Sequence, residues 1–144
     1  MSNNPRVQLF KSVIGNTIWQ DKYPIIKLLN GEVLAVEEGH LTIQFTITKN
    51  LLNPNGILHG GIMSTMLDEL MGAALFTMNN ENPFATINLN VDFLSAAREN
   101  DIIIGIGEVV KNGKTVANTK AKLLLNNKVI AKGTSNLVRM PNKV

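Results

Sequence analysis

The chain has 144 residues, of which 44% are hydrophobic, and a formal net charge of +3. This length fits a single domain, because domains cluster at roughly 100 to 150 residues, so we expect one domain over residues 1–144. The absence of cysteine excludes disulfides, a thiol nucleophile and a cysteine-ligated metal, and it suits a reducing cytoplasm. Charged residues interrupt the longest apolar stretch, so we expect no membrane span and no membrane partner.

Much of the positive charge lies late in the chain, in Lys111, Lys114, Lys120, Lys122, Lys128 and Lys132. Proteins that bind nucleic acid combine such charges with aromatic side chains on which the bases stack. No aromatic residue is interleaved with these lysines, so nucleic acid is not an expected partner. We interpret the lysines as solvated strand faces, and the alternative is that they attract an anionic ligand.

Three elements are predicted before residue 50. A mixed apolar pattern favours a short helix over residues 6–14. A strand over residues 32–38 follows the turn signal of Asn30 and Gly31. Residues 41–47 then alternate apolar and polar side chains, which is the period of a strand that buries one face and leaves the other wet.

A long helix is predicted over residues 61–78. Apolar side chains recur there at spacings of three and four residues, and others cover the remaining sides, which is typical of a helix that is buried nearly all round. The polar cluster at residues 79–83 ends the helix. At about 1.5 Å per residue, such a helix crosses a small domain.

The rest of the chain has the pattern of strands. Alternating or β-branched runs cover residues 86–93, 102–110, 117–125 and 128–139. Asn112 and Gly113 mark a tight hairpin turn, and a meander of antiparallel strands is the simplest connection. The predicted fold class is therefore α+β, with a curved antiparallel sheet of about six strands wrapped around one long central helix. A second copy of the chain would cover the side of the helix that still lacks a partner.

Gly60 and Gly61 lie where a loop enters the predicted long helix. The first N–H groups of a helix have no partner within it. Together with the positive end of the helix dipole, they can polarise a carbonyl or hold an oxyanion. At Gly60 a substrate would reach the N–H without meeting a Cβ atom. The alternative is that the two glycines only shape a tight turn.

Asp68 is a carboxylate two turns inside the otherwise apolar helix. Burial of an ionised group costs free energy unless the group is paired, solvated or used, so Asp68 is a candidate for catalysis. The alternatives are that it caps another element or faces solvent at a dimer edge. Glu69 is the adjacent acid, but a helix turns about 100° per residue, so only one of the two faces a given site.

His59 has three interpretations: a base, a metal ligand or a packed polar residue. His40 is the only other histidine, and no ligand set with metal spacing accompanies the two. We therefore predict neither a metal nor a cofactor. Ser64 lacks the G-x-S-x-G context of a nucleophile elbow, so serine chemistry is not favoured.

Several residue types in this segment stand at the spacing of a known family. They are Asn53, Gly56, His59-Gly60-Gly61, Leu67-Asp68 and Gly72-Ala73-Ala74. Together they resemble the signature of the hotdog-fold thioesterases of the phenylacetate-degradation (PaaI) type, which includes thioesterase superfamily member 2. The resemblance covers about residues 32–139. It implies a hotdog fold and hydrolysis of acyl-coenzyme A by a homo-oligomer, with a dimer required and a tetramer expected as a dimer of dimers.

The resemblance also implies a role for each position. Asp68 attacks the thioester carbonyl or activates water, and the Gly60 N–H polarises that carbonyl. Asn53 positions water or substrate, His59 supports the loop that binds the thioester, and Thr86 is the hydroxyl residue near the carboxylate. In such enzymes the acid and the hydroxyl of one subunit face Asn53 and Gly60 of its neighbour.

Three further residues are weaker candidates for substrate contact. Thr65 belongs to a stripe of small side chains that would let a ligand come close, and Gly61 adjoins the polarising amide. Arg98 is a candidate for attracting the phosphates of the coenzyme. Because methionine adapts to many shapes, the candidate linings of an acyl pocket are Met63, Met71 and Phe93.

The loop at residues 95–101 departs from the family pattern. Relatives often carry a Pro-Ala pair and then Gly-Asp before the next strand, whereas this chain has Asn100 and Asp101. Asparagine tolerates the left-handed backbone that glycine supplies, so we expect the turn to survive.

Two functions other than hydrolysis stay open at this point, since a fold does not fix a function. One is a non-catalytic module that binds or senses acyl ligands. The other is a hydratase or dehydratase on the same type of fold, with His59 as the base.

Overall fold

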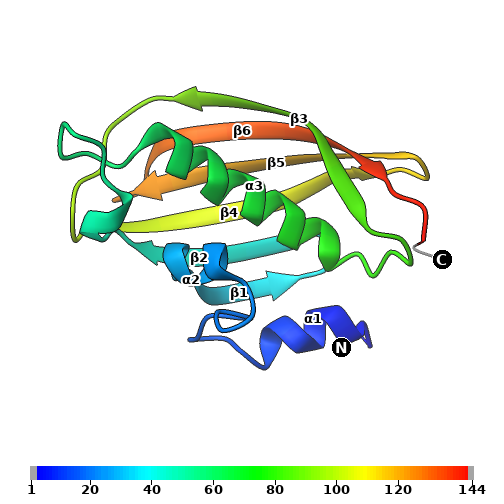
Figure 1. The fold of residues 1–144 in the computed structure, drawn as a ribbon. Coiled ribbons are helices and arrows are strands. Elements are labelled where there is room, and N and C mark those ends of the chain that lie inside the picture. Colours follow the sequence, from blue (N-terminus) through cyan, green and yellow to red (C-terminus); the bar gives the residue numbers. More distant parts are fainter. Residues whose placement is uncertain (1–2, 143–144) are drawn as a thin grey trace.

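The polypeptide forms one antiparallel sheet that curves around a long helix, α3, as the computed structural model shows for residues 3–142 (Figure 1). The helices are α1 (Pro5–Lys11), α2 (Pro24–Leu29) and α3 (Gly60–Phe76), with a 3-10 turn at Lys49–Leu51. The strands are β1 (Glu32–Glu37), β2 (His40–Thr46), β3 (Phe84–Phe93), β4 (Ile102–Asn112), β5 (Val116–Leu125) and β6 (Lys128–Arg139). The predicted α+β architecture is confirmed.

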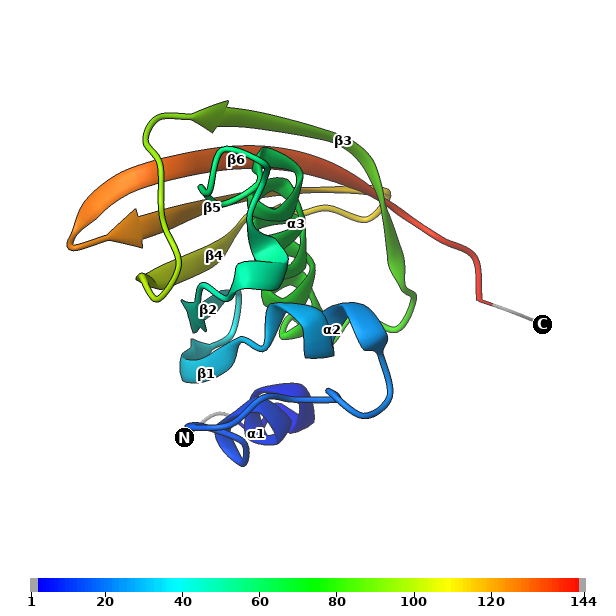
Figure 2. The same cartoon turned by 60° about the vertical axis from the view of Figure 1, so that its left-hand side comes forward.

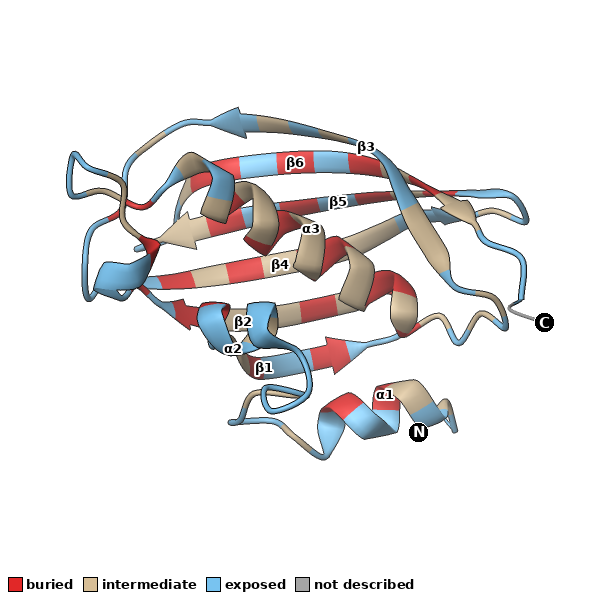
Figure 3. Cartoon of the chain, viewed as in Figure 1, coloured by how far each residue is buried: buried red, intermediate tan, exposed pale blue. Residues whose placement is uncertain are grey.

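Helix α3 buries one stripe and leaves the opposite face half-exposed (Figure 3). The buried residues follow the three-and-four spacing of a helix that packs on one surface: Met63, Met66, Leu67, Leu70, Met71, Ala74 and Leu75. The opposite face carries Thr65, Asp68, Glu69 and Gly72, all half-buried. The prediction of burial nearly all round is therefore wrong for the single chain, because the sheet covers only one side of the helix.

Two glycines of β4 let the backbone of α3 lie directly on the sheet. A Cβ atom at Gly107 would overlap the carbonyl oxygen of Leu70, and one at Gly105 would overlap the Leu70 side chain. Because both positions lack a side chain, the helix axis approaches β4 more closely than any larger residue would allow. This close contact fixes the height of α3, and thus of Asp68, above the sheet.

The strand order is β1-β2-β4-β5-β6-β3. The predicted meander is right for β4, β5 and β6, but β3 pairs with β6 and forms one edge of the sheet, with β1 at the other. A bulge between Thr86 and Asn88 shifts the alternation within β3. Ile87 is 55% exposed as a result, and Phe93 near the end of the strand is 52% exposed.

The N-terminal segment packs beside β1 and β2 (Figure 2). The helix expected over residues 6–14 is the shorter α1, which Asn4 caps by accepting hydrogen bonds from the N–H groups of Arg6 and Val7. Helix α2 is not predicted from the sequence, because six residues are too few to display a helical period. No helix within the described range of the chain is long and apolar enough to cross a membrane.

The loop after β3 makes the turn that we expected. Asn100 has a φ of +70°, which asparagine tolerates better than most residues. Asp101 accepts a hydrogen bond from the Arg98 N–H at 2.7 Å and stabilises this turn. The backbone of Arg98 pairs in turn with Ile57, so this loop lies against the segment that leads into α3.

Candidate active site

Asn53 organises the loop that enters α3. Its Oδ1 accepts hydrogen bonds from the N–H groups of Asn55 at 2.9 Å and Ile57 at 3.4 Å. Gly56 has a φ of +75°, a conformation that glycine adopts without steric cost. The Nδ2 group of Asn53 donates to no acceptor among the residues that the structure describes, so it is available to a ligand or to water.

His59 caps the N-terminus of α3 with a ring nitrogen. Its Nδ1 accepts a hydrogen bond from the Gly61 N–H at 2.8 Å, so Nδ1 carries no proton and Nε2 carries it. A Cβ atom at Gly61 would lie 3.0 Å from this nitrogen, which explains the glycine there. The N–H of Gly60 has no acceptor within residues 3–142, and it is the free donor that polarisation of a carbonyl requires.

Asp68 turns from α3 toward the edge strand β3. The Thr86 hydroxyl donates a hydrogen bond to Asp68 Oδ1 at 3.1 Å, and no other described residue donates to this carboxylate. The Oδ2 atom is therefore open to water or to a ligand. A carboxylate that one hydroxyl orients and that keeps a free oxygen is suited to act as a general base or as a nucleophile.

The oriented carboxylate and the free amide lie far apart on the same helix. Asp68 is eight residues after Gly60, a distance of about 12 Å along the axis at 1.5 Å per residue. A reacting carbonyl must lie about 3 Å from both its attacking group and its oxyanion donor. The structure therefore groups the predicted residues into two sets: Asp68 with Thr86, and Asn53 with His59 and Gly60.

Glu69 lies on the other flank of α3. It lines a small cavity of about 60 Å³ whose other walls are mainly apolar side chains, including Phe10, Trp19 and Phe45. Burial raises the pKa of the Glu69 carboxyl, and the negative charge of Asp68 adds to the rise. The two acids thus have different surroundings, and only Asp68 adjoins Thr86.

We expect Glu69→Gln to increase the free energy of unfolding at neutral pH. Because burial raises the pKa of Glu69 above its ordinary value of 4.5, the folded protein holds this proton more tightly than the unfolded chain does. Stability therefore falls as the pH rises through the interval above 4.5, and glutamine removes that fall. Urea denaturation at pH 4.5 and pH 8 measures the free energy of unfolding of the variant and of the wild type. The variant should gain more over the wild type at pH 8 than at pH 4.5, and an equal gain at the two pH values would contradict the explanation.

Of the three weaker candidates, only Arg98 has a free functional group. Its guanidinium is exposed and forms no ion pair with any residue in the range 3–142. The Thr65 hydroxyl donates to the Gly61 carbonyl at 2.9 Å, and the Gly61 N–H is already taken by His59. These two bonds stabilise the first turn of α3.

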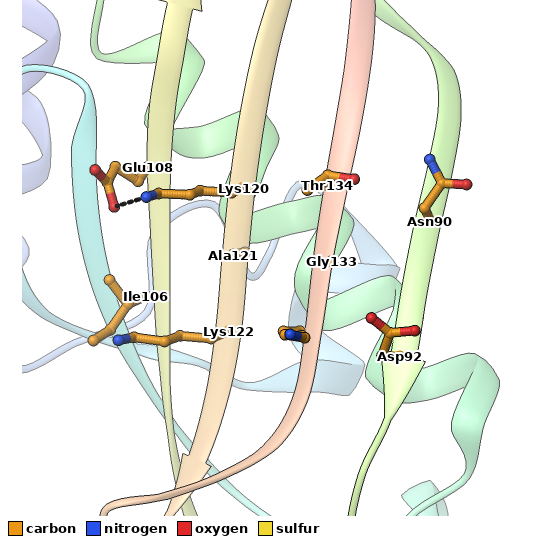
Figure 4. Close-up of a pocket in the computed structure, with 10 residues that line it drawn as sticks. Asn90, Asp92, Ile106, Glu108, Lys120, Ala121, Lys122, Gly133 and Thr134 are labelled. Atoms are coloured by element: carbon orange, nitrogen blue, oxygen red, sulfur yellow. Dashed lines mark ion pairs between the residues drawn. The ribbon is translucent and has the colours of Figure 1, made fainter.

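A broad hollow of about 390 Å³ lies on the face of the sheet that points away from α3 (Figure 4). Lys120, Lys122 and Lys132 lie along it, and Lys120 forms an ion pair with Glu108 at 3.7 Å. All six late lysines are exposed, as solvated side chains would be, and Lys114 lies in the turn between β4 and β5. Asp68 does not border this hollow, so the hollow lies outside the candidate site.

The structure corrects one expectation about the acyl pocket. Met63 and Met71 are 5% and 0% exposed and belong to the core, so they line no open pocket. Phe93 does lie at the site, because a Cβ atom at Gly60 would be 3.6 Å from its ring. No three His, Asp or Glu side chains come together as a metal site in the part of the chain that the structure describes.

A family model supports the class of protein that this site suggests. The model of the thioesterase superfamily matches residues 55–128, which include α3 and the last part of its entry loop. Human acyl-coenzyme A thioesterase 13 is 27% identical over 103 residues, which cover 70% of this chain and 74% of the human protein.

Solved structures share the fold of this chain. The PaaI protein of the Escherichia coli phenylacetic acid degradation operon superposes over 97% of both chains with a TM-score of 0.83 and 17% identity. A hypothetical thioesterase from Streptococcus pneumoniae, solved with coenzyme A, matches 80% of this chain and 92% of its own with a TM-score of 0.73 and 21% identity. The family model, the curated relatives and the fold together show a hotdog-fold thioesterase of the PaaI type. The chain belongs to the thioesterase superfamily, as the sequence resemblance implied.

Proposed function

We propose that the protein hydrolyses acyl-coenzyme A thioesters to a free acid and coenzyme A, without a cofactor. The observation that carries the proposal is the Asp68 carboxylate, oriented by Thr86 at 3.1 Å in a chain of the thioesterase superfamily. The name of the human relative supports acyl-coenzyme A as the substrate. The Streptococcus pneumoniae structure with coenzyme A supports binding of the coenzyme on this fold.

The proposed site forms between two copies of the chain. Within one chain the two sets of residues are about 12 Å apart, and a two-fold axis would bring Asp68 and Thr86 of one subunit to Gly60 of the other. The free edge of β3, with Ile87 and Phe93 exposed, is a surface on which such a pair could form. The dimer, the tetramer as a dimer of dimers and the cytoplasmic location stay predictions.

Each residue has a defined task in the proposed reaction. The Gly60 N–H of the partner subunit donates to the thioester oxygen and stabilises the negative charge that develops there. Asp68 either attacks the carbonyl carbon or removes a proton from the attacking water, and both routes release the thiol of coenzyme A. Asn53 Nδ2 donates to water or substrate, His59 fixes the start of α3, and Arg98 attracts the phosphates of the coenzyme.

Release of free thiol from a panel of acyl-coenzyme A substrates tests this proposal. Because the chain contains no cysteine, a thiol-reactive dye detects only the coenzyme that the reaction releases. We expect saturable turnover, with a kcat/KM of about 10⁴ M⁻¹s⁻¹ or more for the preferred substrate. Saturable binding without thiol release would instead identify a binding or sensing module.

The hydratase alternative requires His59 as a base, and its hydrogen bond opposes this role. Nδ1 already accepts from the Gly61 N–H at 2.8 Å, and Nε2 carries the proton, so neither nitrogen has a free lone pair. Incubation with enoyl and 3-hydroxyacyl thioesters separates the two reactions, because a hydratase interconverts them and leaves the thioester intact.

A further inference from the structure

Thr86 reaches Asp68 only because strand β3 contains one extra residue. Successive side chains of a strand point to opposite faces of the sheet. Leu89 packs against the core that α3 and the sheet enclose, so its face of β3 is the face toward α3. Thr86 stands three residues earlier, and regular alternation would turn it to the far face of the sheet. Its hydrogen bond to Asp68 at 3.1 Å shows that it points toward α3 instead.

The extra residue is Ile87. Thr86 is opposite Leu137 in the pairing of β3 with β6. Asn88, two residues later, is opposite Asn136, the residue that adjoins Leu137. Two steps along β3 therefore match one step along β6, and such a bulge shifts the alternation of side chains by one position. The bulge thus gives Thr86 its place beside α3.

Hydrophobic burial does not by itself select the bulge. With the bulge, Phe84 turns inward and packs against the cluster of Leu75 and Leu137. In a regular strand Ile87 would turn inward instead, whereas it is 55% exposed in the structure. Burial of either side chain stabilises the fold by a similar amount. Polar contacts must therefore decide which arrangement forms.

Side chains from three neighbouring strands surround the bulge. Asn88 Oδ1 accepts hydrogen bonds from the backbone N–H and from the Nδ2 group of Asn136, each 3.1 Å long. Asn136 Oδ1 in turn accepts from Nδ2 of Asn118 on β5. The hydroxyl of the buried Ser135 donates to the backbone carbonyl of Asn88 at 2.9 Å. Asn88 is therefore held through both its side chain and its backbone.

The bulge replaces backbone hydrogen bonds by side-chain hydrogen bonds. In a regular antiparallel sheet, an N–H group that points to the neighbouring strand donates to a backbone carbonyl. Here the Asn136 N–H donates to the side chain of Asn88, and the Asn88 carbonyl accepts from the Ser135 hydroxyl. A backbone group that loses its partner away from water costs free energy. The amide of Asn88 therefore removes a cost that the bulge would otherwise carry.

We propose that Asn88 is a positioning residue of the candidate active site, because its side chain holds the bulge that directs Thr86 to Asp68. Asn88 acts from outside the site, since it forms no hydrogen bond with either residue. Without its amide, the regular strand becomes the more stable arrangement, and Thr86 turns away from Asp68 while Ile87 takes its place. The consequence for turnover rests on the proposed thioester hydrolysis.

Asn88→Val tests the proposal, because valine favours strands and has no acceptor for the Asn136 N–H. We expect thiol release to show a kcat that is lower by about 10- to 100-fold, since misplacement of a reacting group by 1 Å costs on the order of 100-fold. KM should stay within about twofold, because the groups that bind the coenzyme are unchanged. Asn88→Asp keeps an acceptor oxygen at the same place and should restore most of the kcat.

Thr86→Val separates positioning from a general loss of stability. In a chain without the Thr86 hydroxyl, the bulge has no donor to direct. Addition of Asn88→Val to Thr86→Val should therefore lower kcat by no more than about twofold further, because two residues that act through one contact are not additive. Losses that multiply in the double variant would mean that Asn88 acts independently of Thr86, and the inference would be overturned.

Asn90→Val is the matched control. Asn90 is the next residue on the same face of β3 and lines the hollow beside Lys120 and Lys122 (Figure 4). Its side chain takes no part in the contacts around the bulge, so its replacement should leave kcat unchanged. An equal loss in the Asn88 and Asn90 variants would assign the effect to the strand as a whole and overturn the inference.

A crystal structure of Asn88→Val gives a readout that does not depend on activity. It should show Ile87 turned toward α3 and the Thr86 hydroxyl no longer bonded to Asp68. A retained bulge, with Thr86 still bonded to Asp68, would overturn the inference and leave the proposed function standing. Asn88→Ala carries the same tests where circular dichroism shows that valine prevents folding, and loss of the fold in both variants would assign Asn88 to stability instead. A wild type that releases no thiol would refute the proposed function, while the crystal structure still decides whether Asn88 directs Thr86.

Discussion

Replacement of Asp68 by asparagine is expected to lower kcat by about 1,000-fold, within the range that a positioned acid–base group supplies. Asparagine has the size of aspartate and an oxygen that still accepts the hydrogen bond from Thr86, which is 3.1 Å long in the native chain. It cannot take a proton from water or attack the carbonyl as a carboxylate does. Steady-state thiol release measures kcat, and circular dichroism with gel filtration shows whether fold and assembly are retained.

Glu69→Gln is the matched control for this experiment. It neutralises the neighbouring acid of the same helix, but Glu69 lines the small cavity near Phe10 and Trp19 instead of facing Thr86. We expect its kcat to stay within about threefold of the wild type, the range of ordinary context effects. Loss of activity in Glu69→Gln with near-normal activity in Asp68→Asn would transfer the catalytic role to Glu69.

Gly60→Pro is expected to lower kcat by about 100- to 1,000-fold, the usual effect of removing one oxyanion donor. Proline lacks the backbone N–H, and it is otherwise favoured at the first position of a helix. His59 has φ −63° and ψ 132°, an extended conformation that is compatible with a following proline. The substitution therefore removes the donor and keeps the helix start.

Gly60→Ala separates the N–H from the absence of a side chain. A Cβ atom at this position would lie 3.6 Å from the Phe93 ring, which is an ordinary contact, and alanine keeps the N–H. If only the donor matters, the alanine variant keeps most of its activity and the proline variant does not. Equal losses in the two variants would show that the substrate needs space at Gly60, and the polarising role would then be wrong.

The Asp68→Asn and Gly60→Pro variants together show whether the site is shared between subunits. The two variant proteins are combined in equal amounts, dissociated and allowed to reassociate. Half of the dimers then contain one Asp68→Asn chain and one Gly60→Pro chain. One of the two sites in each mixed dimer has both native groups, so about a quarter of the wild-type activity returns. A mixture without recovery would place both groups in one chain, against the separation of about 12 Å.

The sequence alone allowed prediction of the elements with a long or regular period. Helix α3 and strand β2 were placed within one or two residues, because side-chain periodicity is a local property of the chain. The pairing of β3 with β6 was not predicted, since alternation shows that a segment is a strand but does not name its partner. The bulge at Thr86 moved Ile87 out of the predicted pattern, because a bulge arises from the pairing itself.

Residue types at fixed spacing determined the class of this protein before any coordinates. The resemblance that the family model later confirmed rested on Asn53, Gly56, His59-Gly60-Gly61, Leu67-Asp68 and Gly72-Ala73-Ala74. Only the tertiary structure decided that Thr86 orients Asp68, that His59 uses its ring to cap α3, and that Glu69 points elsewhere. The surroundings of Asp68 and Glu69 depend on how α3 lies against the strands and the N-terminal segment, and local sequence does not encode that packing. The His59 cap spans only two residues, but its ring orientation is set by side-chain rotation, which the sequence pattern does not show.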